Sequence, residues 1–331
     1  MHCELVAPGL FAAPAAARLP SLELLLARGR CTSAGSQSLE TWLHEAFELE
    51  QPLAAGALTL LGASGDPGEL RWMRADPVHL RLMRDRLILV PAAALHIAHD
   101  EADALTEALN RHFARRLTVQ PIDAERWVAR AEEDFPIDAQ SPLELAGRDV
   151  ALGMPAGAGG SPSHQLLNEA QMVLHSHPVN EAREARGEPA VNSVWLWGSG
   201  RAPSVVSKRW HSVTANEPLA LGLARAAAMR YRALPASAEA WLGRVPEEGR
   251  HLVILDALRV PLVLSETGDY QDAIARFERD WFAPLLAALR AGRIGMVTIH
   301  VPDAAECLAY ETIRADLRRF WRRPKALERY A

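Results

Sequence analysis

Residues 251–256 read His-Leu-Val-Ile-Leu-Asp, and residues 295–301 read Gly-Met-Val-Thr-Ile-His-Val. Both are short apolar runs of the length of a β-strand. Between them, residues 270–289 show the apolar spacing of a long helix that is interrupted near Pro284. A strand, a helix and a second strand in this order predict an α/β fold around a mostly parallel sheet.

The rest of the chain continues this alternation of strands and helices. Residues 2–7 form an apolar run that predicts a buried strand, and residues 21–28 predict a helix capped by Ser21 and ended by Gly29. Further strands are predicted at 58–61, 70–73, 87–90 and 191–197, and helices at 39–49, 100–113, 166–177 and 219–229. The glycine-rich run at 153–163 predicts a loop or linker.

Composition excludes several classes of protein. The chain has 331 residues and a formal charge of −5, which argues against a protein that mainly neutralises nucleic-acid phosphates. Its apolar runs are too short to span a membrane. Cys3, Cys31 and Cys307 are too few and too far apart for a disulfide framework, and no basic residue precedes Arg18 as a secretory signal would require. We expect a cytoplasmic protein, with no membrane partner and no nucleic acid, of two domains or one domain with an insertion.

Local motifs leave several chemistries open. His175 and His177 are two residues apart at the end of a helical pattern, where their side chains diverge, so a shared metal is disfavoured. The basic side chains of residues 314–329 accompany apolar positions spaced for one helix face, which fits a solvated surface helix or a patch for an acidic partner. Arg74 and Arg183 are either ordinary surface residues or forks that hold a phosphate or carboxylate.

Three segments carry a resemblance to a known family. Residues 167–183 read LNEAQMVLHSHPVNEAR, residues 187–200 read GEPAVNSVWLWGSG, and residues 320–325 read FWRRPK. They resemble the RpfE-type regulatory proteins of proteobacteria, which have a WLWGxG segment and an FWRRPK-like tail. This resemblance covers nearly the whole chain and implies a regulatory role.

More distantly, the chain is similar to the archaeal-type cofactor-independent phosphoglycerate mutases of the alkaline phosphatase superfamily, strongest over residues 74–200. That resemblance implies an alkaline-phosphatase-like α/β core interrupted by a smaller inserted α/β domain. It also implies two divalent metals, a serine that carries the phosphoryl group, and arginines that hold the substrate. On this basis the core is expected at residues 1–65 and 190–331, and the insert at 66–189.

The metal site implied by the mutases is poorly matched. Ser36 has the position of the nucleophile but lacks the family's neighbouring Asp and His, and Ala7-Pro8 replaces the Asp-Gly turn that binds metal. Asp256 and His300 remain as weak metal candidates. One carboxylate cannot hold two divalent ions, so no metal site is expected and Ser36 is interpreted as a vestigial nucleophile position.

The insert keeps more of the family pattern. Arg74 and Asp76 resemble its arginine-bearing strand start, and Asn180, Arg183 and Asn192 match its HPVN-to-Gly-x-Gly succession. These five residues are the candidates for ligand binding.

We therefore expect a phosphoglycerate-mutase-like protein that has lost its two-metal catalytic site and is a non-catalytic regulatory or ligand-binding protein. It would need no cofactor, and a phosphorylated small molecule or a protein would be its partner. One alternative is an active phosphomutase or phosphatase with Mn or Zn at a rearranged site built from His175, His177, Asp256, His300 or Asp303. Another is an interaction protein that uses a basic C-terminal helix.

Overall fold

The computed structural model describes residues 1–35, 37–83, 86–132, 137, 139–146, 148–150, 162–303 and 307–330. Contacts divide the chain into two compact units, Met1–Glu48 with Val206–Ala331, and Leu49–Val205. No helix among the described residues is long and apolar enough to cross a membrane. The predicted loop at 153–163 lies almost entirely outside the described residues.

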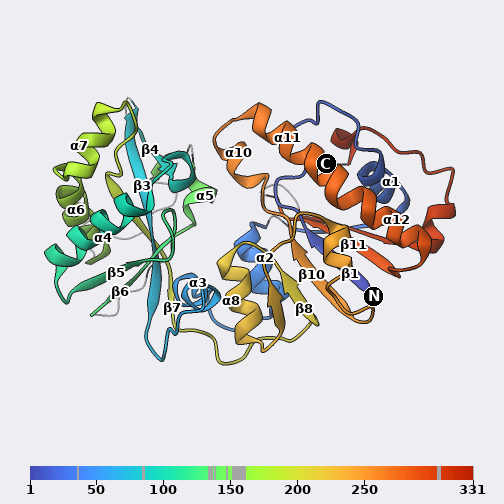
Figure 1. Cartoon of the computed structure of the whole chain (residues 1–331), viewed down its shortest axis with the longest axis horizontal. Helices are drawn as coiled ribbons and strands as arrows, with labels where there is room; N and C mark the ends of the chain where they lie inside the picture. Colours follow the sequence, from blue (N-terminus) through green and yellow to red (C-terminus); the bar gives the residue numbers. More distant parts are fainter. Residues whose placement is uncertain are drawn as a thin grey trace. The chain divides into compact units, whose positions relative to one another are not determined.

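The first unit is built on a mostly parallel sheet, as the sequence predicts. Among the described residues it has seven strands in the order β2-β12-β11-β1-β10-β8-β9. Figure 1 shows the four strands β11, β1, β10 and β8 side by side. The central β1 is parallel to both β10 and β11, the edge formed by β8 and β9 is parallel too, and β12 and β2 run antiparallel. The strands are β1 (His2–Val6), β2 (Arg30–Ala34), β8 (Ser212–Thr214), β9 (Arg230–Arg232), β10 (Arg250–Ile254), β11 (Met296–Val301) and β12 (Cys307–Ile313).

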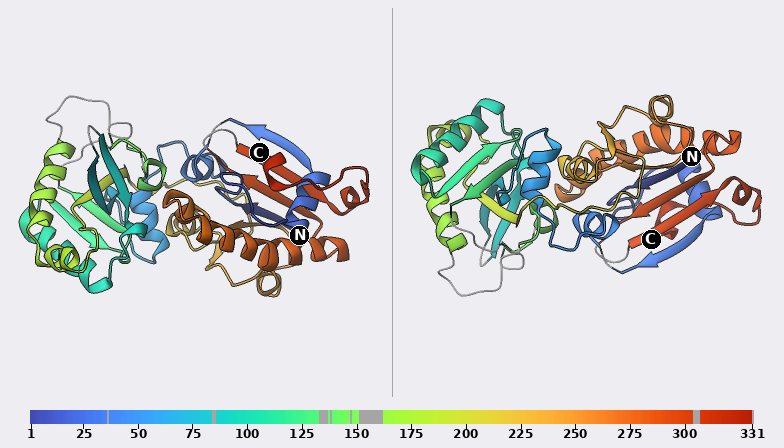
Figure 2. Two further views of the ribbon diagram at one scale, coloured as in Figure 1. Left: turned by 90° about the horizontal axis from the view of Figure 1, so that it is seen from above. Right: turned by 90° about the horizontal axis from the view of Figure 1, so that it is seen from below.

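One face of this sheet carries the hydrophobic core of the unit. Leu5, Val253 and Ile299 belong to a buried cluster with residues of α1, α11 and α12, and these helices lie together on that face (Figure 2). The predicted interruption near Pro284 is a π-helical segment, η3, which joins α11 to α12 just before the proline, a residue with no N–H to donate. The helices are α1 (Pro20–Arg28), α2 (Leu39–Ala46), α8 (Pro218–Ala226), α9 (Ala238–Leu242), α10 (Arg259–Val263), α11 (Thr267–Phe277), η3 (Glu278–Phe282), α12 (Ala283–Ala291), η4 (Arg314–Arg318) and η5 (Leu327–Arg329).

The second unit has an antiparallel sheet, with five strands in the described residues. The long β3 pairs with β7 on one side and with β6 and then β4 on the other, and β5 pairs with β6. The strands are β3 (Trp72–Met83), β4 (Arg86–Pro91), β5 (Leu117–Pro121), β6 (Trp127–Ala131) and β7 (Ser193–Gly200).

Helices cover both faces of this second sheet. Leu105 of α4 and Leu174 of α6 are buried with Trp127 in the main cluster of the unit. Leu60 of α3 is buried with Trp72 and Val128 in a smaller cluster. The helices are α3 (Ala55–Gly62), η1 (Ala92–Ala94), α4 (His99–Phe113), α5 (Pro142–Leu145), α6 (Pro162–His175) and α7 (Pro178–Ala185).

The boundaries of the two units differ from the expected ones. The sequence placed them after residues 65 and 189, whereas contacts place them after Glu48 and Val205. Both α3 and β7 therefore belong to the Leu49–Val205 unit, because α3 packs on β3 and β7, and β7 is paired with β3.

Three local predictions were wrong. Residues 58–61 are part of α3 and not a strand, because a short apolar run does not distinguish the two. Residues 314–329 do not form one helix: η4 and η5 are short and separate, and the side chains of Phe320 and Trp321 are 78% and 66% exposed. Helix α1 begins at Pro20, so Ser21 is not its cap. Instead, the carboxylate of Glu278 accepts hydrogen bonds from the backbone N–H groups of Ser21 and Leu22, at 2.7 and 3.0 Å.

Candidate functional site

The carboxyl ends of the parallel strands bring several predicted residues to one edge of the first unit. Val6, at the end of β1, is paired with Ile254 of β10 and with His300 of β11. Asp256 lies two residues after the end of β10, and Asp303 lies two residues after the end of β11. Ligands of α/β proteins bind at this edge of the sheet, so it is the first place to search for a site.

Ser36 lies outside the described residues, but its neighbours are placed at the same edge. The backbone N–H of Gln37 donates to the carbonyl of Asp303 at 3.0 Å, and that of Cys307 donates to the carbonyl of Gly35 at 3.2 Å. The segments on either side of Ser36 are therefore bound to the residues that follow β11.

An arginine is paired with a carboxylate at this edge. Nη2 of Arg259, in α10, lies 2.7 Å from Oε1 of Glu40, in the first turn of α2. Burial lowers the pKa of Arg259, but the charges of Glu40, Glu217 and Asp256 raise it above its ordinary value. The guanidinium is thus a fixed positive charge among three carboxylates.

A second charged group is centred on Glu4 of β1. Its Oε1 lies 2.6 Å from Nη2 of Arg250, and Nδ1 of His2 and Nε2 of His300 lie 3.5 and 3.6 Å from the carboxylate. Burial raises the pKa of Glu4, but His300, His2 and Arg250 together lower it to about 2. Glu4 is therefore ionised at neutral pH, and His300 also lies against Trp42, with ring centroids 5.2 Å apart.

Glu4 and His300 line a pocket of about 300 Å³ between α2 and strands β2 and β12. Its polar lining also includes Glu45 and Gln37, which are hydrogen-bonded to each other, the thiol of Cys307, and Arg209. Burial and the charge of Glu45 raise the pKa of Cys307 to about 11. At neutral pH the pocket thus presents the ionised carboxylate of Glu4 and a protonated thiol, which is a weak nucleophile.

Among the described residues, no group of three or more His, Cys, Asp or Glu side chains is arranged to hold a metal ion. At the end of β1 the chain supplies Ala7 and Pro8, which have no ligand atoms in their side chains, and the carboxylate of Glu40 is paired with Arg259.

Arg74 and Asp76 of the second unit are bonded to each other in its interior. Nε and Nη2 of Arg74 donate to Oδ1 of Asp76 at 3.0 and 2.6 Å, and Nη1 donates to Thr59 at 3.2 Å. The indole N–H of Trp197 donates to Oδ2 of Asp76 at 2.7 Å. Both charged side chains are buried and hold β3, α3 and β7 together.

Asn180, Arg183 and Asn192 also have partners within the protein. The amide of Asn180 bonds to backbone groups of residues 174 and 191, and that of Asn192 to the backbone of residue 80. Arg183 is fully buried and donates to the backbone carbonyls of residues 95 and 189 and to Glu101. These contacts account for a structural role, and ligand binding by the five predicted residues stays a prediction.

The two histidines of the HSH sequence have separate surroundings. His175 is the last residue of α6, and His177 is the N-cap of α7, where its Nδ1 accepts from the backbone N–H of Val179 at 3.2 Å. His177 therefore begins a helix, which is a sufficient reason for its position.

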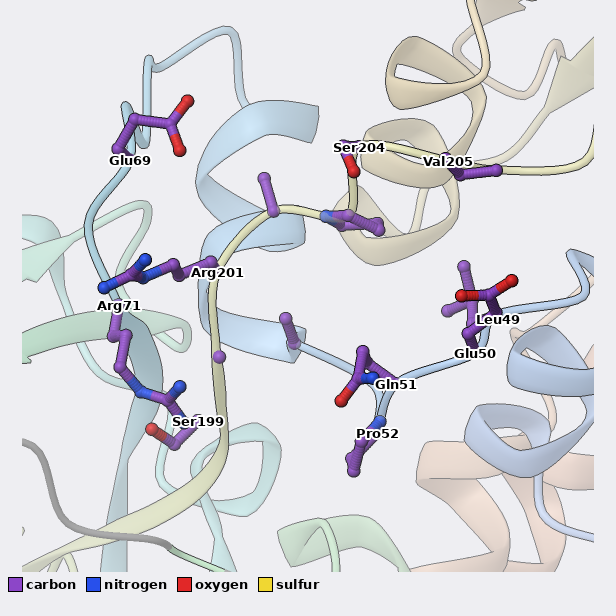
Figure 3. A pocket seen from close by; sticks show the side chains of 14 residues that line it. Leu49, Glu50, Gln51, Pro52, Glu69, Arg71, Ser199, Arg201, Ser204 and Val205 are labelled. Atoms are coloured by element: carbon purple, nitrogen blue, oxygen red, sulfur yellow. The ribbon is translucent and has the colours of Figure 1, made fainter.

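The sequence analysis missed a larger pocket, of about 550 Å³, in the second unit (Figure 3). Arg71, Arg201 and Ser199 line one side of it, and Glu50 and Gln51 line the other. The sequence signal for this pocket is Arg201, which directly follows Gly198-Ser-Gly200.

The fold is similar to that of a solved protein. The chain is similar to the solved PH0037 protein of Pyrococcus horikoshii, with a TM-score of 0.57 and 14% identity over 94% of this chain and 87% of that one. At this identity the likeness is one of fold alone. No family model matches the sequence.

Sequence comparison gives a distant homology to the cofactor-independent phosphoglycerate mutases. A probable 2,3-bisphosphoglycerate-independent phosphoglycerate mutase of Geobacter sulfurreducens is 26% identical over 58% of this chain and 51% of its own length. The corresponding mutase of Methanosarcina barkeri is 30% identical over 34% of this chain and 29% of its own. The chain thus aligns with about half the length of the first of these relatives and less of the second.

Proposed function

We propose that this chain is a cytoplasmic, phosphoglycerate-mutase-like protein that binds a phosphorylated small molecule or a protein partner and does not interconvert phosphoglycerates. Its proposed role is regulatory, as the resemblance to the RpfE-type proteins implies. The distant homology to the mutases supports a common origin. The chemistry at the carboxyl edge of the first sheet supports the loss of turnover.

The observation that carries this proposal is the position of Arg259. In a two-metal phosphoryl-transfer site, carboxylates hold divalent cations that bind the transferring oxygens. Here the positive charge beside Glu40 belongs to a side chain, which has no open coordination position for substrate. Its neighbours Glu217 and Asp256 keep it charged.

Turnover and metal content test this proposal directly. The protein, purified without chelator, is assayed for interconversion of 2- and 3-phosphoglycerate with Mn²⁺ or Zn²⁺, and its metal content is measured. We expect no turnover above that of the Ser36→Ala variant. Stoichiometric metal and turnover that Ser36→Ala abolishes would instead establish the alternative, an active phosphomutase or phosphatase with a rearranged site.

The C-terminal segment favours a second candidate function, binding of an acidic partner. Phe320 and Trp321 are exposed side by side, and residues 318–325 also carry four arginines and a lysine. Exposed aromatic and arginine side chains are typical of the energetic centres of interfaces. If this segment binds a partner, the double variant Phe320→Ser/Trp321→Ser should lose a salt-sensitive complex that the wild-type protein retains, while a normal melting temperature shows that the fold is intact.

A further inference from the structure

Glycine residues of β7 determine how closely one wall of the 550 Å³ pocket in the second unit approaches the start of α3. Gly200 and Ser199 form one wall, and a Cβ atom on Gly200 would lie 2.6 Å from the Cβ of Ala54. At Gly198, φ is +57° and a Cβ would lie 2.4 Å from that of Ala55. Only glycine permits this approach of β7 to the start of α3, so the pocket is built into the fold of the unit.

The arginines of this pocket come from neighbouring strand ends. Trp72 of β3 is paired with Gly200 of β7, and the residues beside this pair are Arg71 and Arg201. Figure 3 shows both side chains on the same side of the pocket as Ser199. Arg201 is exposed and has no ion pair or hydrogen bond with any other residue that the structure describes, whereas Arg71 and, across the pocket, Gln51 each already have an interaction within the protein. Two guanidinium groups and a hydroxyl form a donor set for a phosphate or carboxylate group.

The opposite side of the pocket has different chemistry. Glu50 and Gln51 lie across from Ser199, whereas Glu69 lines the pocket on the same side as Arg71 (Figure 3). Carboxylate and amide oxygens accept hydrogen bonds from hydroxyl groups but repel a second anionic group. The lining therefore fits a ligand with one anionic end and a hydroxylated body. A volume of 550 Å³ lies within the range of small-molecule sites.

We infer that this pocket binds a sugar phosphate or sugar acid, with the anionic group between Arg71 and Arg201 and the hydroxyl groups toward Glu50 and Gln51. The inference deepens the proposed ligand-binding function and rests on it. It places the ligand apart from the five residues predicted from the sequence, whose side chains are bonded within the protein.

Thermal shift and calorimetric titration of the full chain test this inference, with four probes: glucose 6-phosphate, glucuronate, glucose and inorganic phosphate. We expect the melting temperature to rise with at least one of the two anionic sugars at millimolar concentration, and less with glucose or phosphate alone. A response to glucose 6-phosphate alone identifies phosphate as the anionic group, and a response to glucuronate identifies carboxylate. Failure of both anionic sugars to bind would overturn the inference.

The residues are tested with matched arginine variants. Arg201→Gln should weaken binding of the anionic sugar by about tenfold or more, since it removes a charged donor. The control is Arg115→Gln in the same unit, whose side chain is 90% exposed and which should leave affinity unchanged. Equal binding by Arg201→Gln and wild type would place the ligand elsewhere. The mutase assay above is independent of this result, so loss of this pocket assignment leaves the proposed absence of turnover standing.

Discussion

Nη2 of Arg259 lies 2.7 Å from Oε1 of Glu40, and the two side chains are only 12% and 13% exposed. The pair joins the start of α10 to the start of α2 at the carboxyl edge of the parallel sheet. Since the other oxygen of Glu40, Oε2, is buried without a hydrogen-bond partner among the described residues, the guanidinium provides most of the compensation for that carboxylate.

Replacing Arg259 with methionine should therefore destabilise the protein. The change leaves a nearly buried carboxylate without its cation, which costs about 3 kcal/mol in the free energy of unfolding, as measured by urea denaturation. Arg279→Met is the control, because Arg279 is 71% exposed in its pair with Asp280 and should change stability by less than about 1 kcal/mol. Equal effects of the two variants would contradict the role assigned to Arg259.

Asp76→Asn should destabilise the second unit. Asp76 accepts three hydrogen bonds from Arg74 and Trp197, and the neutral amide leaves the buried guanidinium without its counter-charge, at a cost of about 3 kcal/mol. Chemical denaturation followed by tryptophan fluorescence measures this change. Glu107→Gln, at an exposed pair with Arg111 in the same unit, should have almost no effect. An Asp76→Asn protein as stable as wild type would show that the buried pair is not needed for folding.

The ionisation of Glu4 should make stability depend on pH in the acid range. Its pKa is about 2 in the folded protein against an ordinary value of 4.5. Because the folded pKa is the lower one, this stabilisation is fully present above pH 4.5 and is lost as the pH falls toward 2. The shift corresponds to about 3 kcal/mol.

Melting temperatures between pH 7 and pH 2 should accordingly fall less for Glu4→Gln than for wild type. Glu169 provides the comparison: the pKa of this residue is also about 2, but its side chain is 30% exposed, so solvent screening should make the effect of Glu169→Gln smaller. Parallel pH profiles for Glu4→Gln and wild type would contradict the prediction.

The three cysteines should differ in their reactivity. Cys31 is exposed on β2, whereas Cys3 and Cys307 are buried, and burial raises the pKa of both buried thiols. Since the thiolate is the reactive form, iodoacetamide at pH 8 should modify Cys31 in the native protein, and the other two only after unfolding. Mass spectrometry of the labelled peptides measures this, with Cys31→Ser as the control. Rapid labelling of Cys307 in that variant would show that its thiol is more accessible, or that its pKa is lower, than stated here.

The parallel sheet was predictable because its strands carry their own signal. Residues 2–7, 252–255 and 295–301 are apolar runs of strand length, and all three became neighbouring strands. The boundaries of the units were less accessible, because they depend on pairing between β3 and β7, which lie more than a hundred residues apart. At residues 314–329 the hydrophobic spacing predicts one helix, but the structure has two short, separate 3₁₀ helices there.

The candidate site was predictable only in part. Ser36, Asp256 and His300 are predicted from a resemblance and stay predictions, while the described neighbours of Ser36 lie near the end of β11. Glu4 and Arg259 gave no signal, because a single charged residue in a strand or after a turn is common and their partners are distant in sequence. Arg74 was selected for its charge, yet the sequence could not show that Asp76, two residues away, neutralises it in the interior.

The central place of β1 has a consequence for the order in which the chain can fold. β1 is synthesised more than two hundred residues ahead of both of its neighbours, β10 and β11, and also ahead of Glu278, which caps α1. The Leu49–Val205 unit, by contrast, is continuous in sequence and can fold while synthesis continues. β1 and α1 therefore lack these partners until some two hundred further residues have been synthesised. During this interval, chaperones and proteases have access to this segment.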